Sequence, residues 1–107
     1  MAKRALPILE QYTTGKPLTF GEMMWAIRVG EEMTLAAFGK SLGVSRQNLH
    51  DIEKGRRSVS AARAAEWATL LGYPVGHFVG LALQAQLDEE GLVGLKVHVG
   101  GKLRKAS

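Results

Sequence analysis

Apolar residues recur at spacings of three and four positions along most of the chain, a pattern typical of short helices that bury one side. Polar residues suited to begin a helix precede most of these stretches, and glycines follow most of them. The pattern predicts five helices, over residues 20–30, 35–42, 46–54, 61–71 and 74–87. It therefore predicts an all-α fold.

Four of the predicted helices are preceded by a Ser or Thr. Thr19 and Glu22 have the spacing of a capping box, in which each side chain accepts a hydrogen bond from the other residue's backbone N–H. Thr34, Ser45 and Ser60 stand before the next three helices, where a hydroxyl oxygen can accept from a free backbone N–H. These residues predict where the first four helices begin.

The N-terminal stretch lacks the helical pattern. Residues 1–18 contain two prolines and a glycine, which predict an irregular arm before the domain. The helical domain is expected over residues 19–87, with Pro74 in the first turn of the fifth helix, where a missing N–H costs nothing. Residues 88–107 then form a C-terminal segment with a basic tail, predicted to mediate dimerisation or to bind a partner.

Within that segment, residues 95–99 alternate apolar and polar side chains, which predicts a short C-terminal β-strand. A single strand leaves its backbone donors and acceptors unpaired, so it needs another strand beside it. That strand could come from the N-terminal arm or from a second copy of the chain. We favour the second copy, which makes the protein a predicted homodimer.

Composition narrows the class of protein. A chain of 107 residues, 46% hydrophobic and 22% charged, has the size and balance of one folded domain. It has no cysteine, which excludes disulfides, thiolate metal sites and cysteine nucleophiles. No apolar run reaches the roughly 18 residues of a membrane span, and the first residues lack the apolar stretch of a secretory signal. The chain is therefore expected to be cytoplasmic, with no membrane partner.

Positive charge is concentrated in one part of the chain. The net charge is +4, which permits a polyanionic partner, and residues 45–63 carry five cations against two anions, a local excess of +3. The acidic residues gather elsewhere, at residues 31–32 and 88–90. The basic stretch is thus the first candidate for contact with a nucleic acid.

The same stretch overlaps a helix-turn-helix pattern that runs from Leu35 to Gly55. Five apolar residues are placed to lock two short helices at a steep angle around a turn at Gly43: Phe38, Leu42, Val44, Leu49 and Ile52. The second helix keeps a polar side, which could enter the major groove of DNA. Arg46 and Gln47 stand at its N-terminal end, and these side chains form paired hydrogen bonds to guanine and adenine, respectively.

These residues resemble the Xre/Cro family of phage-repressor-like helix-turn-helix domains. The resemblance rests on GVSRQNLHDIEKG, followed by RRSVS and LGYPVGHFV, and covers about residues 20–85. It implies a five-helix repressor-like DNA-binding domain, here with the short C-terminal β-strand added.

The resemblance also implies roles for individual residues. The residues expected to contact DNA bases, with His50 near the groove wall, are Ser45, Arg46, Gln47, His50 and Asp51. The residues expected to face phosphates are Thr34, Lys54, the amide of Gly55, Arg56 and Arg57. Arg28 and Glu53 are expected to form a structural ion pair. Asp51 could accept from a cytosine amino group or orient Arg46 or Gln47.

The chain departs from the family pattern at two positions. Leu35 stands where the family usually has a glutamine, which removes one side-chain donor to phosphate. Gly39 stands where the family usually has an alanine, a change expected only to loosen the helix, by about 1 kcal/mol.

The sequence gives little indication of metal binding, nucleotide binding or catalysis. The three histidines, His50, His77 and His98, are too scattered to suggest a metal site, so neither a metal nor a cofactor is predicted. Residues 39–41 read GKS but lack the earlier glycine and the preceding strand of a phosphate-binding loop. No set of carboxylates, serines and histidines suggests catalysis, and an enzyme is not expected.

The leading functional hypothesis is a transcriptional regulator, a repressor that binds double-stranded DNA sequence-specifically as a homodimer. The alternative is the antitoxin of a toxin–antitoxin pair, which would bind a toxin protein through residues 1–18 or 88–107 and regulate its own operon. A third hypothesis, a transcription cofactor with low DNA affinity, is supported only by Leu35 and ranks last.

Overall fold

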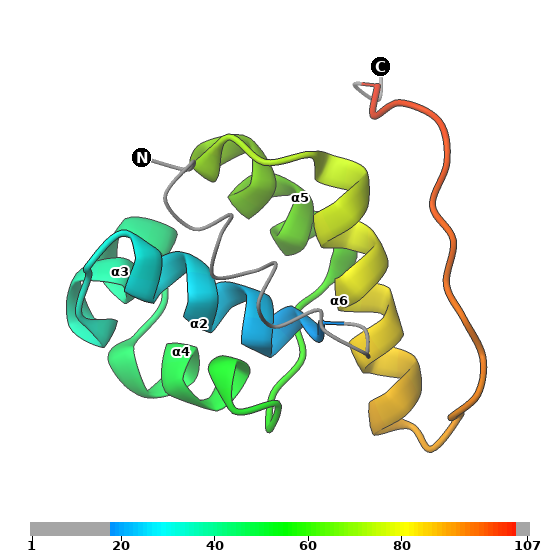
Figure 1. Ribbon diagram of the computed structural model, residues 1–107, viewed down its shortest axis with the longest axis horizontal. Helices are drawn as coiled ribbons and strands as arrows, with labels where there is room; N and C mark the ends of the chain where they lie inside the picture. Colours follow the sequence, from blue (N-terminus) through cyan, green and yellow to red (C-terminus); the bar gives the residue numbers. More distant parts are fainter. Residues whose placement is uncertain (1–17, 105–107) are drawn as a thin grey trace. The chain divides into compact units, whose positions relative to one another are not determined.

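The structure, a computed structural model, describes residues 18–104 (Figure 1). Within this range it contains five α-helices and no β-strand. The helices are α2 (Phe20–Gly30), α3 (Leu35–Leu42), α4 (Arg46–Glu53), α5 (Ala61–Leu71) and α6 (Val75–Glu89). The all-α prediction is confirmed for the described residues, whereas the predicted arm lies almost wholly outside them.

Side-chain caps begin the first four of these helices, as the sequence predicts. Thr19 accepts from the N–H of Glu22 at 3.1 Å, and Glu22 accepts from the N–H of Thr19 at 3.0 Å, which completes the capping box. Thr34, Ser45 and Ser60 each accept from the backbone N–H three residues later, at 3.0–3.1 Å. The starts of α2–α5 therefore follow from local chemistry alone.

The start of α6 differs by one residue from the prediction. Pro74 is the residue before the helix, with extended backbone angles and no side-chain cap, and α6 begins at Val75. Gly72, just before it, ends α5 with a φ of +82°, a left-handed conformation that suits glycine. Extended angles at Pro74 let the chain turn from α5 into α6.

The chain divides into two compact units after Ser58. In the first unit, α2, α3 and α4 pack around apolar side chains that are almost fully buried: Met23, Met24, Ile27, Phe38 and Leu49. The backbones of α2 and α4 approach closely at Gly21, where a Cβ atom would overlap the carbonyl oxygen of Ile52. Glycine at this position therefore permits the close packing that places α4.

In the second unit, α5 packs against α6. Apart from Val59, the buried side chains are small or aromatic: Ala64, Trp67, Ala68, Phe78 and Ala82. The ring of Tyr73 stacks on that of Phe78, with 5.6 Å between their centroids. Gln86 donates to the carbonyl oxygen of Val59 at 2.8 Å, which ties the segment before α5 to the C-terminal part of α6.

The predicted C-terminal β-strand is wrong. Residues 95–99 lie as an extended segment along α6 (Figure 1), and Gln84 bonds their backbone. Its amide donates to the carbonyl oxygen of Leu95 at 2.7 Å and accepts from the N–H of Val97 at 2.9 Å. The side chain of Val99 lies over Gly80. A side chain of α6 thus makes two of the backbone bonds that a neighbouring strand would otherwise make.

Candidate nucleic-acid interface

The turn between α3 and α4 brings two helix ends very close together. Gly43 ends α3 with a φ of +80°, and the N–H of Val44 donates to the carbonyl oxygen of Gly39 at 2.9 Å. A Cβ atom on Gly39 would lie 2.8 Å from the carbonyl oxygen of Val44, closer than such atoms approach. The expectation that Gly39 only loosens the helix is therefore incomplete, because its missing side chain also gives room to the turn.

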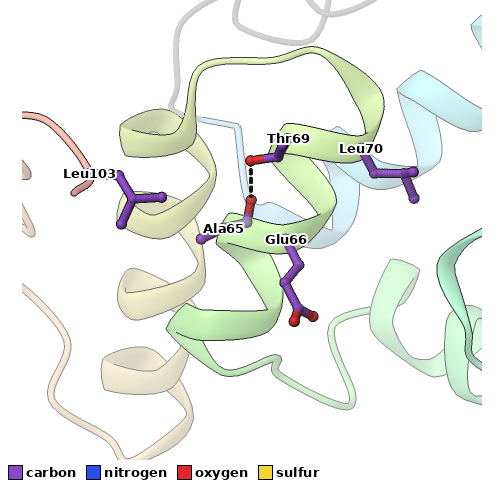
Figure 2. Close-up of a pocket in the computed structure, with 5 residues that line it drawn as sticks. All are labelled: Ala65, Glu66, Thr69, Leu70 and Leu103. Atoms are coloured by element: carbon purple, nitrogen blue, oxygen red, sulfur yellow. Dashed lines mark hydrogen bonds between the residues drawn. The ribbon is translucent and has the colours of Figure 1, made fainter. Parts of the chain in front are cut away.

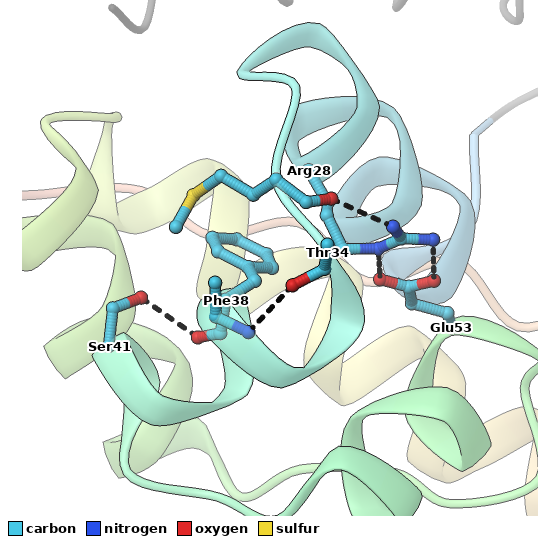
Figure 3. Close-up of polar contacts among 7 residues, drawn as sticks. Arg28, Thr34, Phe38, Ser41 and Glu53 are labelled. Atoms are coloured by element: carbon cyan, nitrogen blue, oxygen red, sulfur yellow. Dashed lines mark hydrogen bonds and ion pairs between the residues drawn. The ribbon is translucent and has the colours of Figure 1, made fainter.

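An ion pair anchors α4 to α2 (Figure 3). The guanidinium of Arg28 donates to both carboxylate oxygens of Glu53, at 2.7 and 3.1 Å, and also to the carbonyl oxygen of Met33 at 3.0 Å. The side chain of Glu53 is only 2% exposed. The structure thus contains the pair that the resemblance implies, in the two-pronged geometry that best fixes an orientation.

The outward side of α4 is polar and accessible. Leu49 and Ile52 are buried on its inner side, whereas Ser45, Arg46 and Gln47 at its start are exposed. His50 and Asp51, one turn further along, are partly exposed. The helix therefore presents together the five residues that are predicted to contact bases.

Asp51 is the centre of a hydrogen-bond network on this side. Its Oδ1 accepts from Nε and Nη2 of Arg56, at 3.2 and 3.0 Å, and from the amide of Gln47 at 3.2 Å. The hydrogen bond from Arg56 is the largest cause that lowers the pKa of Asp51 below its ordinary value of 3.8. Burial opposes it, and the bond from Gln47 and the charges of Arg56 and His50 lower the pKa further. The network therefore holds this carboxyl in its charged form.

The partner of Asp51 differs in part from the one expected. Gln47 reaches the carboxylate as the sequence suggests, but the arginine that does so is Arg56 rather than Arg46. Arg56 follows Gly55, whose φ of +79° turns the chain back toward α4. Nη2 of Arg56 also lies 3.3 Å from Nδ1 of His50. The glycine between helix and arginine is the sequence signal that could have predicted this contact.

The residues predicted to face phosphates lie at two places in the first unit. Thr34 is exposed at the start of α3, and Lys54, Arg56 and Arg57 are exposed just after α4. The amide of Gly55 already donates to the carbonyl oxygen of Ile52 at 3.1 Å. The basic loop after α4 is thus accessible, although the Gly55 amide, which is predicted to donate to a phosphate, already forms a hydrogen bond within the turn.

Residues 26–78 match a family model described as Helix-turn-helix, HTH_3. This segment is a helix-turn-helix domain. The matched segment runs from within α2 into α6 and contains every residue of the predicted interface. None of the curated proteins and none of the solved structures matches the chain. The family match supports a DNA-binding regulator of transcription.

Outside the helix-turn-helix pair, the described residues offer little for other chemistry. A pocket of about 430 Å³ on the second unit is lined by Ala65, Glu66, Thr69, Leu70 and Leu103 (Figure 2). Glu66 is its only ionisable group, so the pocket lacks paired acid and base groups. Within residues 18–104, no three metal-ligating side chains cluster. Nor does any helix in that range have the length and apolar character needed to cross a membrane.

Proposed function

We propose that the protein is a transcriptional repressor that binds double-stranded DNA sequence-specifically as a homodimer. The observation that carries this proposal is that α4 is fixed on one side and accessible on the other. Its inner side is locked by buried apolar residues and by the Arg28–Glu53 pair, while its outer side presents polar side chains to solvent. A rigidly held helix with a free polar side suits insertion into a major groove.

The N-terminal end of α4 is the part proposed to read bases. Arg46 and Gln47 are exposed there and can each form two hydrogen bonds to one base. Ser45, His50 and Asp51 complete the reading surface. The basic residues after α4, together with Thr34, would hold the helix in register through phosphates.

The proposed homodimer is supported by the C-terminal segment. The carbonyl of Leu95 and the N–H of Val97 face Gln84 of α6. Because backbone groups alternate sides along an extended chain, those of Lys96 and His98 face away from α6. A second copy of this segment could pair with that outer edge. Two recognition helices related in this way would read two half-sites about 34 Å apart.

The exposed apolar residues of the second unit favour a protein partner, which keeps the antitoxin as the second candidate. They are Leu70, Leu92, Val93, Leu95, Val99 and Leu103. Exposed apolar side chains of this kind fit either the homodimer or a toxin that the chain would neutralise. Co-purification of a second small protein with the chain, expressed from its own operon, would favour the antitoxin.

Selection of bound sequences from a random duplex pool tests the proposal. Repeating the selection at two salt concentrations separates base reading from attraction to phosphates, because only the latter weakens steeply with salt. We expect an enriched palindrome with half-sites one helical turn apart. If no sequence is enriched, specific DNA recognition is wrong and the protein partner becomes the main function.

A further inference from the structure

Arg56 is held against the recognition helix by an acidic residue of that helix. Nε and Nη2 of Arg56 both donate to Oδ1 of Asp51, and Gln47 donates to the same oxygen. The pair is accessible to solvent, with exposed side-chain fractions of 56% for Arg56 and 25% for Asp51. A DNA duplex approaching α4 would therefore meet a carboxylate that has already engaged two of the proposed DNA-binding residues.

The Nε and Nη2 groups of Arg56, which donate to Asp51, are also the groups with which Arg56 would bind a phosphate. Nε and one Nη form the edge of a guanidinium that binds a phosphate in the two-pronged geometry. While that edge faces Asp51, Arg56 cannot offer it to a phosphate. Likewise, the amide N–H of Gln47 that donates to Asp51 is not available to a base.

We propose that Asp51 is a specificity-determining positioning residue that withholds Arg56 from phosphates unless the bound base pairs satisfy its carboxylate. This inference rests on the proposed DNA-binding function. A phosphate contact by itself carries no sequence information. Through Asp51, the phosphate contact of Arg56 would come to depend on the DNA sequence. The partner that it selects is a duplex with an amino group in the major groove opposite Asp51.

Two kinds of duplex differ in what they offer the Asp51 carboxylate once Arg56 has moved to a phosphate. On a sequence without a suitable donor, moving Arg56 to a phosphate leaves the charged carboxylate of Asp51 unpaired near other phosphates, which repel it. On a sequence with a cytosine N4 or adenine N6 amino group at that position, the base replaces the lost hydrogen bonds. Discrimination then arises from a penalty against wrong sequences as well as a gain on the right one.

Four variants of the full chain test this inference. Asp51→Asn keeps the shape of the side chain but removes the charge that holds Arg56. Arg56→Gln removes the held group, and the double variant tests whether Asp51 acts through it. Glu66→Gln is the matched control, because it removes one negative charge at an exposed position on α5. Thermal unfolding of each variant verifies that the fold is retained.

Affinity is measured across a salt series, on the enriched duplex and on a scrambled duplex of equal composition. We expect Asp51→Asn to bind the scrambled duplex several-fold more tightly than Glu66→Gln does. For Asp51→Asn, the plot of log affinity against log salt concentration should become steeper by about 0.9, the slope expected for one added phosphate contact. The preference for the enriched duplex should fall, and these effects should vanish when Arg56→Gln is also present.

The two proposals fail in different ways. Equal gains for Asp51→Asn and Glu66→Gln on scrambled DNA, or a gain that persists with Arg56→Gln, would overturn the withholding of Arg56 but leave sequence-specific binding intact. Coupling on scrambled DNA without any enriched sequence would support the withholding and overturn the sequence specificity. No binding to any duplex would overturn both.

Discussion

Arg28 and Glu53 join the end of α2 to the end of α4 through two parallel hydrogen bonds, at 2.7 and 3.1 Å. The Glu53 side chain is almost fully buried, so it meets almost no water and is paired with this guanidinium instead. The pair matters for function because α4 is the proposed recognition helix. Its orientation is set by the packing of Leu49 and Ile52 and by this contact.

Arg28→Met should destabilise the protein by about 3–5 kcal/mol, because it leaves the Glu53 carboxylate buried without a partner. The double variant Arg28→Met, Glu53→Leu should recover much of this loss, since it removes both charges and fills the space with apolar groups. Urea unfolding of the two variants measures the difference. A single variant no less stable than the double variant would contradict the structural role of the pair.

Gly21→Ala should also destabilise the first unit, by about 1–3 kcal/mol, because the new Cβ atom would overlap the backbone of α4. The matched control is Gly80→Ala in α6, where a Cβ would lie 3.6 Å from Val99, an ordinary contact. That variant should gain up to about 1 kcal/mol from the higher helix propensity of alanine. Urea unfolding measures the free energy of unfolding of both variants. Equal changes for the two substitutions would refute the close approach of α2 and α4.

Much of this fold could be predicted from the sequence, because the starts of α2–α5 depend on neighbouring residues only. Thr34 and Ser45 cap their helices through bonds that span three residues. The strand prediction failed for a different reason. Alternation at residues 95–99 identifies an extended segment but not its neighbour, and the neighbour is Gln84, which lies 11 residues earlier along the chain.

In the candidate site, too, features set by neighbouring residues could be predicted, whereas features that depend on how the chain folds back could not. The proposed reading face of α4 follows from helical periodicity, since Leu49 and Ile52 point inward and the residues between them are partly exposed. The contact between Asp51 and Arg56 escaped prediction because it crosses the turn at Gly55, whose geometry sequence periodicity does not describe. The crowding at Gly39 likewise depends on how tightly the next turn folds back.

The C-terminal segment offers a test of the proposed dimer. A chain ending at residue 91 should retain its helices, because the buried core residues lie between Leu18 and Ala82, although α6 loses the bond from the Leu92 N–H to the carbonyl oxygen of Leu87 at its end. It should sediment as a monomer and bind the enriched duplex more weakly. Gln84→Ala should have a smaller effect in the same direction, since it removes the bonds to Leu95 and Val97. An unchanged sedimentation profile for the truncated chain would exclude this dimer interface.

The acid titration of Asp51 reports directly on the network around it. Its pKa is lowered chiefly by the hydrogen bond from Arg56, so Arg56→Gln should raise the titration midpoint toward 3.8. A folded-state pKa below the unfolded value stabilises the fold above the unfolded pKa, and this contribution is lost as the pH falls through the folded pKa. The loss is thus confined to acid, below about pH 4. Carboxyl carbon shifts measured by NMR across that range would show it, and a midpoint unaffected by Arg56→Gln would contradict the pair.

The division between base reading and phosphate contact can be tested with three alanine variants. Arg46→Ala and Gln47→Ala should each cost roughly 1–3 kcal/mol on the enriched duplex and little on a scrambled one, because the lost bonds are to bases. Arg57→Ala should weaken both duplexes alike and flatten the salt dependence by about one unit. Equal losses on both duplexes for all three variants would place the reading surface elsewhere. The contrast is informative because Arg46 and Arg57 carry the same charge and are both exposed, so only their positions relative to α4 distinguish them.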